Sequence, residues 1–303
     1  MRTDQPSRTA RKIALNIVSL GATPGAADTL PAGMAHATAR LLVASGAAGP
    51  ALVRWSRSWQ VVSLYHLFDP LMPGEFEGIG RRKVFCEQQL RDALQKGSTQ
   101  VLVLGAGYDT LAWRLAPEFP GVRFFEIDHP ATSRLKQKGI KAMGRPGNLH
   151  LMAEDLARTP LTKVMETEPS WAPNAQTAIL AEGLLMYLPE KAVKALFTQC
   201  HDITGPESRM VFTYIGTGAG GRPDVGWLSG LLLWTMALAG EPWLWSLPPE
   251  RLGAFLADTG WEASPCTPES PSGHGVEFYA VADKQKIKQE RSPFSTRLPP
   301  TAR

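Results

Sequence analysis

Two segments decide the fold: VLVLGAGYDT at residues 101–110 and FFEIDHP at residues 124–130. An apolar run ends at Gly105-Ala106-Gly107, and a second apolar run ends at Asp128, 23 positions after Gly105. This layout is typical of a nucleotide-binding β-α-β unit, in which glycines let a ligand approach the backbone and the acid accepts hydrogen bonds from ribose hydroxyls. We therefore predict that Gly105, Ala106, Gly107 and Asp128 bind a nucleoside.

The third glycine of the dinucleotide fingerprint is missing, because Thr110 stands in its place. A pyrophosphate needs a crowded, glycine-lined helix start more than a nucleoside without phosphates does. The pattern therefore favours an adenosine-type ligand without phosphates, of which S-adenosylmethionine (SAM) is the obvious one. An NAD-dependent dehydrogenase is the rival enzyme class, and a tight turn with no ligand is the simplest alternative for a lone GxG.

Strand and helix patterns alternate along most of the chain. Residues 33–96 read as helices interrupted by a turn-rich stretch at 69–80, with a clear helix over 82–96. After them come six apolar runs separated by helical patterns, at residues 101–104, 122–127, 148–155, 176–183, 208–215 and 275–283. Such alternation predicts an α/β fold with a doubly wound, mostly parallel sheet, whose ligands bind at the carboxyl ends of the strands.

Two further strand ends carry acids. Asp155 ends the third run, where it would either cap a helix or accept a hydrogen bond from an adenine amine, with Leu156 facing the ring. Glu182 ends the fourth run, and a carboxylate buried there is costly without a cation. The ammonium group of SAM would supply that cation, so we predict that Glu182 binds it.

Basic and proton-accepting residues complete the candidate site. One of Arg81, Arg82 and Lys83 would pair with the SAM carboxylate, unless the three form a solvated cluster. His129 and Tyr187 are the candidate catalytic bases if the acceptor is a phenol, although a lone histidine more often has a structural role. The six histidines form no metal-binding spacing, so no metal site is expected.

Composition sets broad limits. The chain has 303 residues, 44% of them hydrophobic, and a formal net charge of +4 that is concentrated at its two ends. Aromatic residues do not interleave with these basic ends, so we expect no nucleic-acid partner and a disordered tail over 284–303. The three cysteines show no CxxC spacing, which favours a reducing cytoplasm.

Neither apolar segment of the chain predicts a membrane span. Residues 1–30 form a weakly patterned lead whose apolar part is short. The uninterrupted apolar stretch at 227–239 has 13 residues, whereas a span needs about 20. We expect no stable membrane insertion, and we interpret 216–247 as a lid insertion. Its tryptophans would roof a substrate pocket, pack onto the sheet or form a homodimer contact; they are Trp227, Trp234, Trp243 and Trp245.

The segments GAGYDTLAWRL, FFEIDHPATSRLK, AEDL and AEGLLMYLPE resemble the leucine carboxyl methyltransferase family, which includes bacterial polyketide O-methyltransferases. The likeness covers residues 65–283 and implies a class I SAM-dependent methyltransferase with a seven-stranded sheet. It also implies a helical N-terminal cap over 1–96 and a SAM-binding domain over 97–283. The family's contacts fall on Arg81 for the carboxylate, Gly105 in the glycine loop, Asp128 for ribose, Asp155 and Leu156 for adenine, and Glu182 for the amine.

This sequence departs from the family pattern at two places, and both departures affect what we expect of its site. The family motif R-T/V-R/H-F reads Arg81-Arg82-Lys83-Val84 here, which leaves open the basic residue that pairs with the cofactor. No lysine lies between Lys12 and Lys83, although the phosphatase-modifying members use one in the cap. We therefore expect a SAM-dependent O-methyltransferase that acts on a carboxylate or hydroxyl of a small apolar or aromatic molecule. The non-enzymatic alternative is a SAM-binding scaffold.

Overall fold

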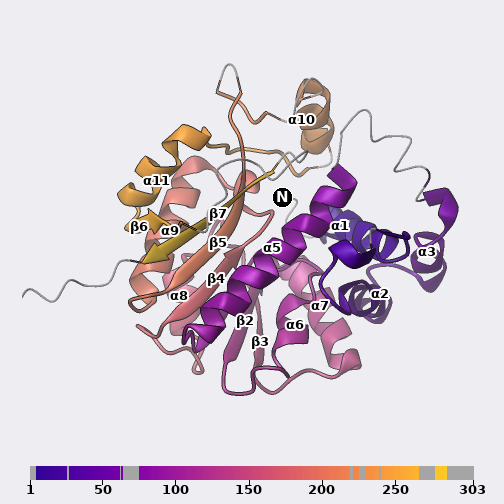
Figure 1. Ribbon diagram of the computed structural model, residues 1–303, viewed down its shortest axis with the longest axis horizontal. Coiled ribbons are helices and arrows are strands. Elements are labelled where there is room, and N and C mark those ends of the chain that lie inside the picture. Colours follow the sequence, from indigo (N-terminus) through magenta and orange to yellow (C-terminus); the bar gives the residue numbers. More distant parts are fainter. Residues whose placement is uncertain are drawn as a thin grey trace, which may run out of the picture.

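One seven-stranded sheet in the order β3-β2-β1-β4-β5-β7-β6 forms the centre of the computed structural model (Figure 1). The structure describes residues 5–25, 27–61, 63, 75–218, 221–224, 229–238, 240–265 and 277–284. The strands are β1 (Gln100–Leu104), β2 (Arg123–Asp128), β3 (Leu149–Ala153), β4 (Thr177–Ala181), β5 (Arg209–Ile215), β6 (Trp261–Ala263) and β7 (Glu277–Lys284). Strands β1 to β5 pair in parallel, and β7 runs antiparallel to both β5 and β6.

Helices cover both faces of this sheet (Figure 1). The α-helices are α1 (Arg8–Leu20), α2 (Met34–Ser45), α3 (Pro50–Trp55), α5 (Glu75–Gln95), α6 (Leu111–Leu115), α7 (Pro130–Met143), α8 (Leu161–Glu166), α9 (Glu190–Ile203), α10 (Ser229–Leu238) and α11 (Leu252–Asp258). The short 3-10 helices are η1 (Ala27–Thr29), η2 (Leu185–Tyr187) and η3 (Pro249–Arg251). One core packs α8, α9 and α11 on the sheet, and a second packs α2, α5, α6 and α7 on its other face.

The predicted α/β sheet is confirmed, including its mostly parallel character. Strands β1, β4 and β5 are buried along their whole length, as expected of parallel strands covered on both faces. The sequence pattern missed β6, because a three-residue strand is too short to show a period. Its Trp261 is nevertheless buried, and the indole N–H donates to the carbonyl of Phe197 at 3.0 Å.

The N-terminal region is more ordered than predicted. Residues 8–20, expected to be a weakly patterned lead, form α1, whose Ser7 hydroxyl accepts the Ala10 N–H at 3.0 Å. The helix α5 begins at Glu75, inside the stretch predicted to be turn-rich. A Cβ on Gly80 would lie 2.7 Å from the Thr29 hydroxyl, so this glycine allows close packing and does not mark a turn.

The sequence pattern predicts that the helix beginning near Pro130 ends at Gly139, but α7 extends past this glycine. A Cβ on Gly139 would lie 2.7 Å from a Leu41 methyl group and 2.9 Å from the Ser45 Cβ. Gly139 therefore lets α2 pack closely on α7, and α7 continues to Met143. The helices of the predicted cap thus share a core with the sheet, and the domain boundary near residue 96 stays a prediction.

Only the first residue of the predicted tail lies within the described part of the chain. β7 includes Lys284, whose ammonium donates to the carbonyls of His201 and Thr204 at 2.6 Å; residues 285–303 of the predicted tail lie outside the described residues. Of the helices in the described part of the chain, none combines the length and the apolar character that crossing a membrane requires.

Candidate functional site

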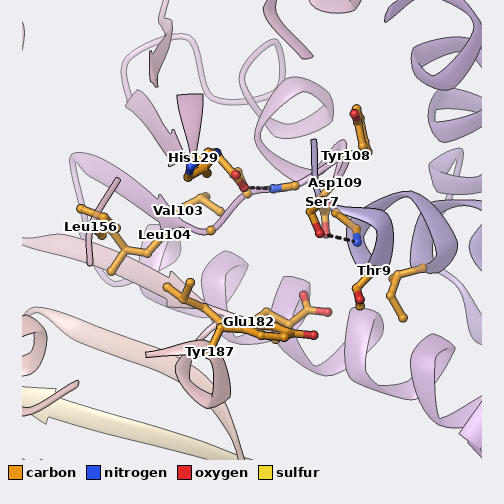
Figure 2. Close-up of a pocket in the computed structure, with 18 of the residues that line it drawn as sticks. Ser7, Thr9, Val103, Leu104, Tyr108, Asp109, His129, Leu156, Glu182 and Tyr187 are labelled. Atoms are coloured by element: carbon orange, nitrogen blue, oxygen red, sulfur yellow. Dashed lines mark hydrogen bonds between the residues drawn. The ribbon is translucent and has the colours of Figure 1, made fainter. Parts of the chain in front are cut away.

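A cavity of about 280 Å³ opens at the carboxyl ends of β1 to β4. Figure 2 shows Leu156 at one end of it and Thr9 of α1 at the other, with Glu182 and Tyr187 between them. The fold brings together nearly all of the residues predicted from the sequence at this one place. Those lining the cavity are Gly105, Ala106, Gly107, Asp128, His129, Asp155, Leu156, Glu182 and Tyr187.

The glycine loop follows β1 and turns sharply. Gly105 has φ +67°, and a Cβ there would lie 2.9 Å from a Leu184 methyl group. Gly107 has φ +48°, and its N–H donates to the Asp128 carboxylate at 2.5 Å. Positive φ angles favour glycine, so the GAG pattern is explained by both conformation and close approach.

The surroundings of Asp128 only partly stabilise the charged form of its carboxyl group. Burial raises the pKa of its carboxyl above the ordinary value, although the Gly107 N–H and the nearby Lys136 ammonium favour the charged form. A buried carboxylate whose charge is only partly compensated by neighbouring groups is typical of functional sites. Ligand hydroxyl donors would complete its solvation, as the predicted ribose contact requires.

Both interpretations of Asp155 stay open in the structure. Its carboxylate accepts the Ala157 N–H at 3.0 Å and its carbonyl accepts the Arg158 N–H at 2.9 Å, so Asp155 caps a turn. No regular helix starts here, however, and Asp155 also lines the cavity beside Leu156. Capping one N–H leaves acceptor capacity on the carboxylate.

Five buried side chains from α5, β7 and the loops after β1 and β4 form what we name the charge cluster: Arg82, Lys83, Asp109, Glu182 and Glu277. Arg82 Nε lies 2.7 Å and Lys83 Nζ lies 2.8 Å from the same Glu182 oxygen, Oε1. Arg82 also pairs with Glu277, and Lys83 with Asp109. Each of these side chains is at most 12% exposed, so the pairs lie out of bulk solvent.

The ion pairs keep the cluster charged. Burial opposes the charge on Lys83, but Asp109 and Glu182 outweigh it and raise the pKa of the lysine well above its usual value. Burial likewise opposes the charge on Asp109, yet Lys83 holds the pKa of that carboxyl well below its ordinary range. Three carboxylates thus share two basic side chains, and the cluster carries a net negative charge.

The cluster bears on two predicted SAM contacts, which both stay predictions. Arg82 and Lys83 line the cavity, whereas Arg81 is not among the lining residues in the described part of the chain. Successive residues on a helix point about 100° apart, so the three cannot face the pocket equally. Glu182 does not depend on a ligand for all its charge compensation, because its Oε1 meets two basic groups. Its buried Oε2 receives no hydrogen bond from the described residues.

Neither candidate base is well prepared to accept a proton. His129 caps α7, because its Nδ1 accepts the Ala131 N–H at 3.4 Å, which favours the structural interpretation. Burial raises the pKa of Tyr187 to about 12, so its phenol stays protonated near neutral pH. Both residues line the cavity, and their catalytic role stays a prediction.

Sequence reasoning missed the contribution of α1. The cavity is lined from this helix by Ser7, Thr9, Ala10, Ile13, Ala14 and Ile17. The first turn of α1 is held by Glu241, whose carboxylate accepts the N–H groups of Arg8 at 3.0 Å and Thr9 at 3.1 Å, and also the Thr9 hydroxyl. The N-cap Ser7 and the helical spacing of Ile13, Ile17 and Leu20 were the available signal.

The predicted tryptophan roof over the cavity can be checked only in part, because the insertion at 216–247 includes residues outside the described ranges. None of the tryptophans that the structure describes lines the cavity. Trp245 is buried against Phe255, with ring centroids 5.6 Å apart, and Trp234 is 60% exposed to solvent. Trp227 lies outside the described residues. Trp245 therefore packs into the core as the alternative interpretation expected, α1 lines the cavity, and the lid stays a prediction.

No metal centre emerges from the ranges that the structure covers, where no group of three or more His, Cys, Asp or Glu side chains is arranged to hold an ion.

Comparison with known proteins adds a family. The family model described as leucine carboxyl methyltransferase matches residues 47–201. A candidate SAM-dependent methyltransferase of Streptomyces coelicolor is 33% identical over 190 residues, 60% of this chain and 62% of that protein. One from Mycobacterium tuberculosis is 34% identical over 136 residues, 44% of this chain and 38% of that protein. The chain thus matches less than two thirds of the length of either relative.

Among solved structures, a candidate methyltransferase from Thermobifida fusca aligns with a TM-score of 0.57 at 17% identity. The alignment covers 82% of this chain and 94% of that one. At this level of identity the likeness concerns the fold alone, and it agrees with the predicted methyltransferase sheet.

Proposed function

Because the chain belongs to the leucine carboxyl methyltransferase family, we propose that it binds SAM and transfers the methyl group to an oxygen of a small acceptor molecule. The two relatives named above are described as SAM-dependent methyltransferases, which supports SAM as the methyl donor. The proposal needs a cavity that accepts a cationic nucleoside and leaves room for an acceptor.

The charge of the cavity carries the proposal. Carboxylates outnumber basic groups among its lining residues; the acids are Asp109, Asp128, Glu154, Asp155 and Glu182, and the bases are Arg82, Lys83 and Arg158. A lining of this sign favours a ligand that itself brings positive charge and disfavours one whose phosphates add further negative charge. It therefore supports SAM, with its ammonium and sulfonium groups, over NAD.

The residues present fit the parts of that ligand. The buried Oε2 of Glu182, which lacks a hydrogen-bond donor among the described residues, suits an ammonium group. Asp128 suits the ribose hydroxyls, and Leu156 beside Asp155 suits the adenine. Arg82 and Lys83, which line the cavity, suit the ligand carboxylate. SAM would supply an electrophilic methyl group on a sulfonium.

We favour a carboxylate acceptor. An acceptor oxygen forms a bond to the methyl carbon while the carbon–sulfur bond breaks and its electrons pass to sulfur. A carboxylate is ionised at neutral pH and needs no base for this step, whereas a phenol does. The protonated Tyr187 and the capping His129 therefore support a carboxylate. The residues of the protein would act chiefly by positioning, which can supply about 7–11 kcal/mol.

The apolar lining describes the rest of the acceptor. Ile13 and Ile17 of α1 face the same cavity as Leu184 and Leu188 of the β4–α9 connection. These side chains would exclude water from the reacting oxygen and bind an apolar body. An aromatic, polyketide-like acid is one molecule of this class.

Titration calorimetry with S-adenosylhomocysteine, and separately with NAD, tests the donor. Glu182→Gln should weaken S-adenosylhomocysteine by about tenfold or more, since a charge-assisted hydrogen bond is lost. The matched control is Glu190→Gln, because the Glu190 side chain is 67% exposed on α9. Binding of NAD in place of S-adenosylhomocysteine would refute the proposal.

Transfer of a labelled methyl group from SAM to panels of apolar carboxylic acids and phenols tests the reaction. We expect methyl esters from the acids. Tight binding of S-adenosylhomocysteine without transfer to any acceptor would instead favour the scaffold alternative.

A further inference from the structure

The helix α10 presents an apolar stripe to solvent. Leu231, Trp234 and Leu238 are 57%, 60% and 61% exposed. Their spacing of three and four residues places them on one helical face; we name them the α10 stripe. The helix sequence, SGLLLWTMAL, contains no charged residue. Exposed apolar patches of this kind mark interaction sites in soluble proteins.

The segment after α10 carries another exposed apolar side chain and is anchored by backbone hydrogen bonds. The N–H groups of Leu244 and Trp245 donate to the Met186 carbonyl at 2.6 and 3.3 Å. Trp245 points into the core, whereas Leu244 is 53% exposed. Leu244 is therefore held in place by a backbone bond to η2, at the border of the cavity.

Basic side chains adjoin the end of the stripe. The Glu241 N–H donates to the Met236 carbonyl at 3.0 Å, which ties residue 241 to the last turn of α10. The carboxylate of the same Glu241 holds the first turn of α1. Arg8, Arg11 and Lys12 are exposed on α1 beside this junction. The exposed Asp224, which accepts the Ser229 hydroxyl at 3.1 Å, lies at the opposite end of α10.

We propose that the α10 stripe and the basic residues of α1 dock on the surface of an anionic lipid bilayer. Apolar side chains would enter the boundary between headgroups and acyl chains, and Trp234 suits the interface itself. Arg8, Arg11 and Lys12 would face the lipid phosphates. A helix of 10 residues is too short to span a bilayer, which needs about 20, so α10 lies in the plane of the surface.

Charge favours a bilayer over a second copy of the chain. A symmetric contact through the α10 stripe would set the basic residues of each α1 against the Asp224 end of the other copy, where one carboxylate meets three basic side chains. Such a contact leaves an excess of positive charge, whereas anionic lipids offer a phosphate to each basic residue. The charge of this surface therefore complements an anionic bilayer better than it complements a second copy of the chain.

Docking would also orient the cavity. Thr9, which lines the cavity, donates its N–H and its hydroxyl to Glu241, so the basic junction and the border of the cavity are the same place. If the proposed function holds, on which this step rests, the acceptor is an apolar carboxylic acid that partitions into the bilayer.

Flotation with lipid vesicles tests the docking surface on the full chain. We expect binding to vesicles of phosphatidylcholine mixed with phosphatidylglycerol, and weak binding to phosphatidylcholine alone. The variant R8Q/R11Q/K12Q should bind the acidic vesicles about 100-fold more weakly, at about fivefold for each charge. The variant L231Q/W234Q/L238Q should lose binding to both kinds of vesicle. All six substituted side chains are exposed, and thermal unfolding checks that each variant folds.

A second apolar surface provides the matched control. Trp55 and Trp59 are 54% and 74% exposed near α3, beside the exposed Arg54 and Arg57. The variant W55Q/W59Q should leave vesicle binding unchanged. Loss of binding in this variant, or equal binding by the α10 variant and the parent, would overturn the proposal.

Two further measurements distinguish docking on a bilayer from dimerisation, and the docking proposal from the proposed function. Dimerisation in light scattering that the α10 variant abolishes, without binding of the parent to vesicles, would assign the stripe to a second copy and refute the lipid proposal. Calorimetry with S-adenosylhomocysteine on the same variants should give unchanged affinity. Failure of that titration in the parent would count against the proposed function and leave the vesicle result standing.

Discussion

Replacing Asp128 by asparagine should weaken S-adenosylhomocysteine while leaving the fold at least as stable. The charged carboxylate is placed to accept from the two ribose hydroxyls, and hydrogen bonds to charged groups exceed neutral ones by about 1–1.5 kcal/mol each. Two such bonds give a loss of about 2–3 kcal/mol, or about 30- to 150-fold in affinity. The asparagine oxygen still accepts the Gly107 N–H, which Asp128 accepts at 2.5 Å, so the glycine loop keeps its anchor.

The effect of this substitution on stability follows from the raised pKa of Asp128, for which burial is the main cause. A carboxyl with a raised folded-state pKa contributes its full stability below the ordinary value of about 3.9, and this is lost as pH rises through the folded pKa. Asparagine is neutral at every pH. Asp128→Asn should therefore stabilise the ligand-free protein near neutral pH, and this gain should disappear under acid conditions.

Calorimetry gives the affinity, and urea unfolding at several pH values gives the free energy of unfolding. Asp258→Asn, at an exposed position in α11, is the control for removing one carboxylate. Asp128→Ala should lose both the affinity and the anchor of Gly107. Unchanged affinity in Asp128→Asn, together with a fall in stability of more than about 1 kcal/mol, would show that Asp128 is purely structural and would refute the reasoning.

Three other substitutions test the remaining parts of the site. Lys83→Met should destabilise the protein by about 3–5 kcal/mol in urea unfolding, because it leaves buried carboxylates uncompensated; adding Asp109→Asn should recover part of the loss, and no recovery would contradict the pairing. Tyr187→Phe should keep methyl transfer within about threefold in a rate assay, whereas a loss of about 100-fold or more would identify Tyr187 as a base. Glu241→Ala should lower the unfolding free energy by about 1–2 kcal/mol through loss of a helix cap. It should also speed release of S-adenosylhomocysteine in stopped-flow displacement, and an unchanged release rate would show that α1 does not restrain the ligand.

The cofactor side of the cavity was predictable because local pattern and strand order place it. Apolar runs that end in Gly105-Ala106-Gly107, Asp128 and Glu182 determine which residues stand at the carboxyl ends of parallel strands. Parallel strands bring those ends to one edge of the sheet whatever the loops do. The family motif added the helical cap and the number of strands.

The direction of helical side chains was not predictable. The sequence alone does not distinguish the three consecutive basic residues Arg81, Arg82 and Lys83. Only the packing of α5 decides that Arg82 and Lys83 face Glu182. The role of Gly139 was misread for a related reason, since a glycine in a helix marks either an end or a close contact. The distance from Gly139 to Leu41 of α2 distinguishes them.

The sequence by itself determined the parallel sheet, the glycine loop and the acids that end its strands, because these depend on periods of a few residues. Only the tertiary structure decided what closes the cavity and what balances its charge. Glu241 meets the first turn of α1 more than 230 positions away in the sequence, as the bond to Arg8 shows. Arg82 meets Glu277 across a similarly long separation, 195 positions. Contacts between such distant segments leave no periodic signal, since their strength comes from burial and charge that exist only once the chain has folded.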